Sequence, residues 1–569
     1  MIFKKYTQPA AAKVIYLFFL TFCLFPAEKN QPVTLKKWLH VPVYDCTAAK
    51  EIIKTAKELG YETIIIRWEG KLNIGPVKNE KFSRQEAEDL IDYVKNRLGL
   101  EAIPEIKLLS KTQLTFGQNF IKEHPEMILT GEGLRANTMD VFQKTESGKT
   151  VLEEIVLPFI DEYAGLYRNP SHFYLGWDEY PTEDIKKIAD KHNMTVSDVW
   201  AGTLNTVCDH LIRKKITPMI SGDQMLSPAL ADENNALKYP ADSRFKYFSP
   251  LYSRMPVNSA VDLLPCITDI KNKDKIAVVP WHYNKGSLEG EYPSIDFFKW
   301  LGFGQIYGAS WFGDSAISAF SGYAHKKNCT GMIATLWHIH NSPAVKPLLL
   351  PVLVNSIQYF NNPGLPVPAD INPKIIIRSD NKNTAAVKPG DTILLSLSAA
   401  GSGLRFNLRQ RSGDDAKDYK EWEQMPFESR EQWLKSEQGK DYVSWKPARP
   451  GFYDLVGETY KNNLLHQGYM ECGLLVSPVS VAEPAPGNCL LGADLTKDIV
   501  QCDGISAVIL RGKGNAKFGI LKNGAIAGPE GVDCRGTGGI LIYKSAYDCN
   551  ALLAERTAMI EFRINKEQG

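Results

Sequence analysis

The sequence predicts an α/β fold, a (β/α)8 TIM barrel, followed by an all-β region. Between residues 36 and 360, short apolar runs alternate with amphipathic helical segments. The apolar runs are nearly continuous, as expected for a parallel sheet that is covered on both faces. After Pro363 only short, turn-separated runs remain. A chain of 569 residues is expected to hold two to four domains.

Eight apolar runs supply the strands of the expected barrel, which we place at 34–362. They lie at 38–45, 61–70, 100–109, 171–180, 216–225, 275–284, 304–314 and 331–341. The intervening helices include 47–60, closed by Gly60, and 83–99, where Ser83 and Glu86 have the spacing of a capping box. Eight such units in this length fit a TIM barrel with long loops.

Composition narrows the classes of partner. The hydrophobic content of 44% and charged content of 23% are typical of a soluble globular protein. A net charge of +1 gives no indication of nucleic acid or an anionic membrane surface as partner. Ten cysteines are present, but those of the barrel are widely spaced and form no CxxC pair, so no metal site is predicted.

Residues 1–27 have the pattern of a signal peptide. A lysine-containing start precedes an apolar run, Val14 to Phe25, that only Thr21 interrupts. This run is too short for an ordinary membrane span. We expect a secreted, periplasmic or cell-surface protein with no integral membrane span beyond this segment; an uncleaved anchor is the alternative.

Two further domains are expected after the barrel. The proline-rich stretch GLPVPADINP separates the barrel from 371–480, where alternating runs and turns predict an immunoglobulin-like β-sandwich. The region 488–569 is rich in glycine and short strands, and loosely resembles the start of a laminin-G-like lectin domain, here incomplete. The linker also predicts that 34–362 folds by itself.

The stretch SHFYLGWDEY, residues 171–180, carries the strongest functional signal. Its apolar run meets Gly176 and Trp177 and ends in adjacent acids, Asp178 and Glu179, before a helix at 182–192. Active sites of TIM barrels lie where strands end. There the in-and-out alternation of a strand breaks down, so both acids can face one pocket. The alternative is a solvated acid pair that stabilises the start of the helix.

Acidic and aromatic residues recur at the other strand ends. The candidates for substrate binding are Arg67, Glu69, Glu105, Asp223, Trp281, Tyr283, Trp311, Asp314 and Trp337. Aromatic faces can cover the apolar side of a sugar ring, while carboxylates bind its hydroxyl groups. Each residue alone is more often structural, but together they predict a glycan pocket.

These motifs resemble glycoside hydrolase family 20, the β-N-acetylhexosaminidases, and most closely the branch that includes hexosaminidase D. The family's central strand ends in His-x-Gly-x-Asp-Glu, and LGWDE keeps Gly176, Asp178 and Glu179. The runs IIIRWEGKL, AIPEIKLLSKTQLTF, KITPMISGDQML and GMIATLWHIHNS resemble the family's second, third, fifth and eighth strands. The similarity spans roughly residues 36–360.

Five residues depart from the family pattern. Tyr174 stands in place of the usual histidine, Arg67 in place of an acid, Ser110-Lys111 in place of Gly-His, and Ser221 where tryptophan is frequent. These changes bear on substrate preference and on activity.

The resemblance implies exo-acting, retaining hydrolysis of terminal β-linked N-acetylhexosamine, with the acetamido group of the substrate as nucleophile. Glu179 would protonate the leaving oxygen, and burial together with the charge of Asp178 would raise its pKa. Asp178 would orient the acetamido N–H and stabilise the oxazolinium ion. Tyr283 would hold the acetamido oxygen, and Trp337 would stack on the sugar. The mechanism requires neither a metal nor an organic cofactor.

Two alternatives stay open. One is a catalytically impaired barrel that binds glycans. The other is a barrel glycosidase of different specificity, in which Glu179 works with Glu69, Asp223 or Asp314 in a two-carboxylate mechanism.

Overall fold

A computed structural model describes the chain over most of the barrel and the sandwich. The described residues are 34–69, 72–109, 111–129, 137–178, 182–225, 264–283, 292–311, 313–337, 349–380, 382–383, 386–410, 433–449, 451–476, 499–502, 505–510, 517–522, 526–528, 531–533 and 539–542. The expected signal segment, the candidate acid Glu179 and much of the C-terminal tail lie outside these residues.

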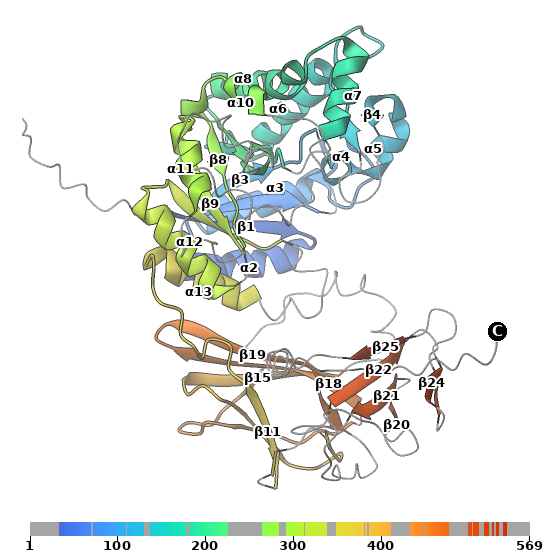
Figure 1. The fold of residues 1–569 in the computed structure, drawn as a ribbon, viewed down its shortest axis with the longest axis vertical. Coiled ribbons are helices and arrows are strands. Elements are labelled where there is room, and N and C mark those ends of the chain that lie inside the picture. The colour runs from blue at the N-terminus through green and yellow to red at the C-terminus, as the bar shows by residue number, and fades with distance from the viewer. Residues whose placement is uncertain are drawn as a thin grey trace, which may run out of the picture.

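The first region is the expected barrel. Eight parallel strands close in the order β1-β10-β9-β8-β7-β6-β3-β2 (Figure 1). They are β1 Lys36–Val43, β2 Thr63–Trp68, β3 Glu101–Glu105, β6 His172–Tyr174, β7 Thr217–Ser221, β8 Ala277–Val279, β9 Gln305–Ser310 and β10 Gly331–Thr335. Each overlaps one of the eight apolar runs, which confirms the predicted TIM barrel.

Helices surround the barrel. They are α2 Cys46–Leu59, α3 Arg84–Asp92, α4 Thr112–Thr115, α5 Gly117–Glu123, α6 Leu157–Leu166, α7 Thr182–His192, α8 Thr203–Arg213, α10 Leu264–Thr268, α11 Pro293–Trp300, α12 Asp314–Lys326 and α13 Leu349–Asn361. The predicted caps are present: Gly60 ends α2 in a left-handed conformation, and Ser83 and Glu86 form a capping box.

The interior of the barrel changes from apolar to polar along the strands. The apolar layer consists of Trp38, Ile65, Ile103, Tyr174, Met219, Ala277, Val279, Tyr307, Ala309 and Ile333, with Trp281 packed against it. Side chains two residues apart on a strand share a face. The residues two positions further along each strand therefore also point inward. Several of them are polar, namely His40, Arg67, Glu105, Ser221 and Thr335. The sequence thus places a polar layer at the carboxyl end of the barrel.

The second region is a β-sandwich. One sheet has the order β12-β11-β14-β17 and the other β13-β19-β18-β15-β16. Their bounds are β11 Ile375–Ser379, β12 Lys382–Asn383, β13 Ala386–Val387, β14 Ile393–Leu397, β15 Ser402–Gln410, β16 Leu434–Lys435, β17 Val443–Trp445, β18 Gly451–Lys461 and β19 Leu464–Val476. Residues of both sheets share one apolar core, so they pack face to face.

The described residues of the C-terminal region contain six further strands. The strands β20 Ile499–Cys502, β21 Ile505–Leu510, β22 Lys517–Lys522 and β25 Gly539–Ile542 form an antiparallel sheet, and β23 Ile526–Gly528 pairs with β24 Gly531–Asp533. A β-rich region was expected here; the laminin-G-like identification stays a prediction.

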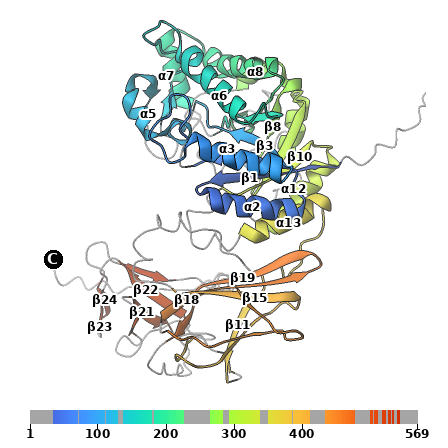
Figure 2. The same cartoon turned by 180° about the vertical axis from the view of Figure 1, so that it is seen from behind.

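A hairpin joins the sandwich to the barrel. The turn between β18 and β19 is Asn462-Asn463, both with positive φ (53° and 64°), as a two-residue type I′ turn requires. Leu464, just after the turn, is buried in the same apolar cluster as the barrel helices. Leu465 packs with Leu350 and Val354 of α13. Both views show β19 beneath α13 (Figures 1 and 2).

Within the described residues, no helix has the length and apolarity needed to cross a membrane.

Candidate active site

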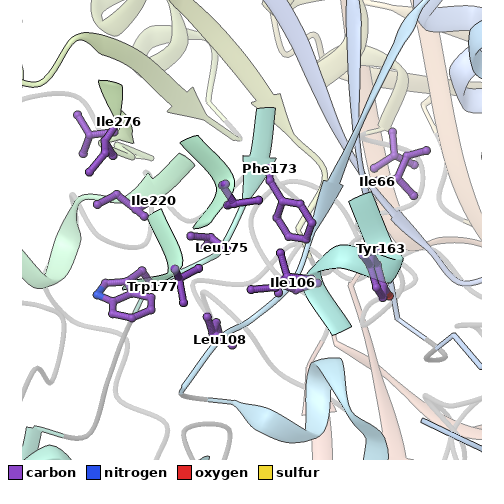
Figure 3. Close-up of a cluster of buried hydrophobic side chains, with 14 of the residues drawn as sticks. Ile66, Ile106, Leu108, Tyr163, Phe173, Leu175, Trp177, Ile220 and Ile276 are labelled. Carbon is purple, nitrogen blue, oxygen red and sulfur yellow. The ribbon is translucent and has the colours of Figure 1, made fainter. Parts of the chain in front are cut away.

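The backbone turns sharply after β6. Gly176 and Trp177 both have left-handed conformations, with φ of 68° and 67°, and such a conformation in a bulky residue is strained. Trp177 is buried on the outer, helix-covered side of the barrel, where Figure 3 shows it near Leu175, Leu108 and Ile220. The chain then returns, and Asp178 lies against side chains from the end of β3.

Two lysines bind the carboxylate of Asp178. Lys107 Nζ lies 2.9 Å from Oδ1, and Lys111 Nζ lies 2.8 Å from Oδ2. Lys107 follows β3 at an inward position, whereas Lys111 belongs to the next loop and has a left-handed backbone, with φ of 52°. All three residues are buried. Each carboxylate oxygen of Asp178 therefore accepts a charge-assisted hydrogen bond from an ammonium group.

The ion pairs continue into the barrel. Lys107 Nζ also lies 2.9 Å from Glu105 Oε1, and His40 Nε2 lies 2.6 Å from Glu105 Oε2. Bases and acids thus alternate along one buried chain, His40, Glu105, Lys107, Asp178 and Lys111, which we call the ion chain. Removing one member of such a chain leaves a buried charge uncompensated, which is strongly unfavourable.

The ion chain sets the protonation of its members. Burial alone would raise the pKa of Asp178, but Lys107 and Lys111 outweigh it and hold that pKa well below its usual range. For Glu105, burial is likewise outweighed, by Lys107 and His40, and the pKa falls to about 2. Burial lowers the pKa of His40 to about 4, although Glu105 opposes this. At neutral pH the carboxylates of Glu105 and Asp178 are therefore ionised, and the imidazole of His40 is neutral.

Steric contacts explain why the LGWDE motif has glycine at position 176. A Cβ at Gly176 would lie 2.8 Å from Lys107 Cδ and 3.0 Å from the carbonyl oxygen of Ile106. Because the stem of Lys107 passes this close, only glycine lets the ammonium reach Asp178.

Aromatic residues flank the ion chain. Trp337, just after β10, has Arg67 Cζ at 4.7 Å and Lys107 Nζ at 5.0 Å from its ring centroid, and the ring of His40 at 3.9 Å. Arg67 also pairs with Glu69. Cationic side chains therefore contact the tryptophan that was expected to stack on a sugar, through cation–π interactions.

A second aromatic group comes from β8 and β9. Trp281 and Tyr283 stack with ring centroids 5.1 Å apart, and Trp311 meets Tyr283 edge-on at 5.4 Å. Burial raises the pKa of the Tyr283 hydroxyl well above its usual value. Tyr283 thus contacts both tryptophans of this second group.

Two predicted acids have different surroundings. Asp223 is buried in a turn directly after β7, close enough to Tyr174 for its charge to raise the pKa of that hydroxyl, after burial and the charges of Glu105 and Asp178. Asp314 begins α12, and its carboxylate accepts a hydrogen bond from Asn355 of α13 at 2.8 Å. This hydrogen bond of Asp314 leads toward α13 and away from the ion chain.

The departures from the family pattern compensate one another. Tyr174 and Ser221, which replace the usual histidine and tryptophan, share a hydrogen bond of 2.7 Å between their hydroxyls. Lys111, in place of histidine, binds Asp178, and Arg67, in place of an acid, pairs with Glu69.

His40, Lys107 and Lys111 were not among the predicted site residues. The inward parity of β1 and β3 could have indicated the first two, since Lys107 stands two residues after Glu105.

Within the described stretches, no group of three or more histidine, cysteine or acidic residues is arranged to hold a metal ion.

Comparison with known proteins gives structural similarity only. No protein-family model matches the chain, and no curated protein matches it in sequence. The chain is similar to the family 20 chitobiase of Flavobacterium johnsoniae, with TM-score 0.37 and 12% identity, over 57% of this chain and 47% of that one. It is similar to a β-N-acetylhexosaminidase from Bacteroides fragilis, with TM-score 0.39 and 13% identity, over 59% of this chain and 68% of that one.

The catalytic domain of a β-amylase from Paenibacillus polymyxa is also similar, with TM-score 0.38 and 13% identity, over 59% of this chain and all (100%) of that one. The match spans about half of the chitobiase, 47% of its length. With TM-scores below 0.5, these similarities establish neither the family nor the reaction of this chain.

Proposed function

We propose that this chain is a glycoside hydrolase that acts at the carboxyl end of its barrel, with Glu179 as general acid. The observation that carries the proposal is the placement of Asp178. This carboxylate lies where β6 ends in a closed barrel, is held ionised by Lys107 and Lys111, and adjoins the aromatic residues of β8 to β10. Fixed charge of this kind, aimed at a developing cation, is a principal means of catalysis.

The substrate proposed is a glycan with terminal β-linked N-acetylhexosamine. Its acetamido oxygen attacks C1 while Glu179 protonates the leaving oxygen, and Asp178 orients the acetamido N–H and stabilises the oxazolinium ion. A carboxylate oxygen has two lone pairs, so Asp178 can accept this further hydrogen bond while bound to its lysines. The two lysines balance its charge, so Asp178 contributes less to keeping Glu179 protonated than an unpaired neighbour would.

A specific observation favours a second candidate, a glycan-binding barrel without turnover. Both oxygens of Asp178 are engaged by lysines, and Arg67 and Lys107 contact Trp337. These contacts occupy groups that substrate-assisted hydrolysis needs for the sugar.

Chromogenic β-N-acetylglucosaminide, β-N-acetylgalactosaminide and β-glucoside substrates test the proposal. Glu179→Gln should lower turnover at least ~100-fold, the lower range for general acid catalysis, and less for substrates with good leaving groups. The control is Glu183→Gln, the same change in the first turn of α7, which should leave turnover unaltered. Asp178→Asn should lower turnover even with a good leaving group, because positive charge still develops in the first step.

The possible results separate the candidates. Equal hydrolysis of β-glucoside and β-N-acetylglucosaminide would exclude substrate assistance, since a glucoside has no acetamido nucleophile. Binding of N-acetylated sugar without any hydrolysis would instead identify the second candidate.

We further propose that the sandwich is immunoglobulin-like. In its sheets β11, β14 and β17 are neighbours, as are β15, β18 and β19, an order that matches the two-sheet arrangement of that fold. We also propose export directed by residues 1–27; the N-terminus of the mature protein should then lack the first ~25–30 residues.

A further inference from the structure

One buried amide connects the barrel to the sandwich. Asn355, on α13, is 1% exposed. Its Nδ2 donates hydrogen bonds to Asp314 Oδ1 at 2.8 Å and to the carbonyl oxygen of Leu465 at 3.0 Å. Its Oδ1 accepts a hydrogen bond of 2.8 Å from the N–H of Leu465. An asparagine amide has two N–H donors, so both are used, one toward each region of the chain.

The Asp314 side of this connection leads to Trp311, one of the aromatic residues that follow β8 and β9. Asp314 follows Trp311 by three residues, and Trp311 contacts Tyr283 edge-on at 5.4 Å. Between them, Gly313 has φ of 87°, and its carbonyl oxygen accepts hydrogen bonds from the N–H groups of Ala316 and Ile317. Gly313 is thus held at the start of α12.

The Leu465 side leads to the hairpin of the sandwich. Leu465 packs against Leu350 and Val354 of α13, and Leu464 lies in the apolar cluster of the barrel helices. Apolar burial is roughly proportional to area and has no preferred direction. The hydrogen bonds of Asn355 are directional, so they fix the position of the Leu465 backbone relative to Asp314.

We propose that Asn355 is a positioning residue: through Asp314, it couples the docking of the β18–β19 hairpin to the position of the segment that carries Trp311. The sandwich then helps to build the pocket of the barrel. This inference deepens the proposed function, since Trp311 belongs to the same pocket, but its first test needs no turnover.

Backbone amide exchange of the full chain, followed by mass spectrometry, tests the coupling. Asn355→Ala should speed exchange at least ~10-fold in peptides that cover 313–318, since local opening sets exchange rates. Leu465→Ala loosens the hairpin but leaves the Asn355 and Asp314 side chains in place, and should also speed exchange there. The control is Asn361→Ala, the same change on α13, which removes only a hydrogen bond from Lys37; exchange at 313–318 should stay unchanged.

Kinetics give a second readout if the chain hydrolyses a glycoside. Displacing a binding residue should raise KM more than it lowers kcat, so Asn355→Ala should raise KM and Asn361→Ala should not. Unchanged exchange at 313–318 in both the Asn355 and Leu465 variants would overturn the coupling, as would an equal increase in the Asn361 variant. An exchange response without any turnover would overturn the proposed reaction but leave the coupling standing.

Discussion

Lys107 is the residue on which the charge balance of the pocket depends. Its ammonium contacts both buried carboxylates of the ion chain, Glu105 and Asp178, at 2.9 Å. Both carboxylates have a depressed pKa, with Lys107 the largest opposing influence to burial in each case. A depressed pKa stabilises the fold above the unfolded value of about 4, and this stabilisation is lost as the pH falls through the folded pKa.

Lys107→Met should therefore lower the free energy of unfolding by ~3–5 kcal/mol at pH 7, the cost of leaving buried charge unpaired. The pKa of each carboxylate should rise toward or above its unfolded value, so the variant loses less stability than the wild type does as the pH falls. The difference between the two proteins should then shrink as the pH falls toward 4, because protonation neutralises the unpaired carboxylates. Urea unfolding at pH 7, 5 and 4 measures this.

Lys186→Met is the control, since Lys186 forms an exposed pair with Asp190 and should change stability by less than ~1 kcal/mol. A loss for Lys107→Met that is the same at every pH would show that Lys107 acts through packing alone.

The sequence predicted part of this site. Strand period and strand ends indicated Arg67, Glu105, Asp178 and Trp337 as candidates, because inward positions of a barrel strand recur every second residue. Lys111 could not be found in this way, because it lies in the loop after β3. Its own left-handed backbone conformation brings it to Asp178. Asp314 was assigned to substrate by its place after β9, but its contact with Asn355 depends on how α13 packs, which no local pattern specifies.

Among the elements, the bend after β6 determines where Asp178 lies. The strand itself has three residues, and the two left-handed residues that follow replace the ordinary alternation. Eight strands and their helices were predictable from apolar periodicity, whereas this bend was visible only as a glycine in a motif. Glycine is needed there because the side chain of Lys107 packs against Gly176, which is a tertiary contact.

Gly176→Ala should test the bend. A left-handed alanine costs about 1–2 kcal/mol, and the added Cβ would also push Lys107 away from Asp178. Gly60→Ala is the matched control, because Gly60 has φ of 95° but no atom within 4 Å of the added Cβ. The unfolding free energy should fall further for Gly176→Ala than for Gly60→Ala, and only the former should share the pH dependence of Lys107→Met. Equal losses for the two variants would mean that the contact with Lys107 does not matter.

At the scale of the whole molecule, the hairpin contact bears on the expected independence of the barrel. The proline-rich linker predicts that 34–362 folds alone, yet Leu464 and Leu465 lie against α13 and its neighbours. We expect the fragment 34–362 to fold but to melt at a lower temperature than the fragment 34–476, because the shorter one exposes Leu350 and Val354. Burying one such side chain is worth roughly 1.5–3 kcal/mol. Scanning calorimetry of both fragments decides this, and identical melting temperatures would contradict it.

The alternation of charge along the ion chain also determines how this pocket can be redesigned. Each charged member has a neighbour of opposite sign, so replacing one leaves a net charge in a dry interior. A library that varies one of these positions at a time should therefore yield mostly destabilised chains. A library that removes an acid together with its base, such as Glu105 with Lys107, should retain many more folded ones. New specificities are then reached by exchanging residues in pairs, as the hydroxyl pair of Tyr174 and Ser221 already illustrates.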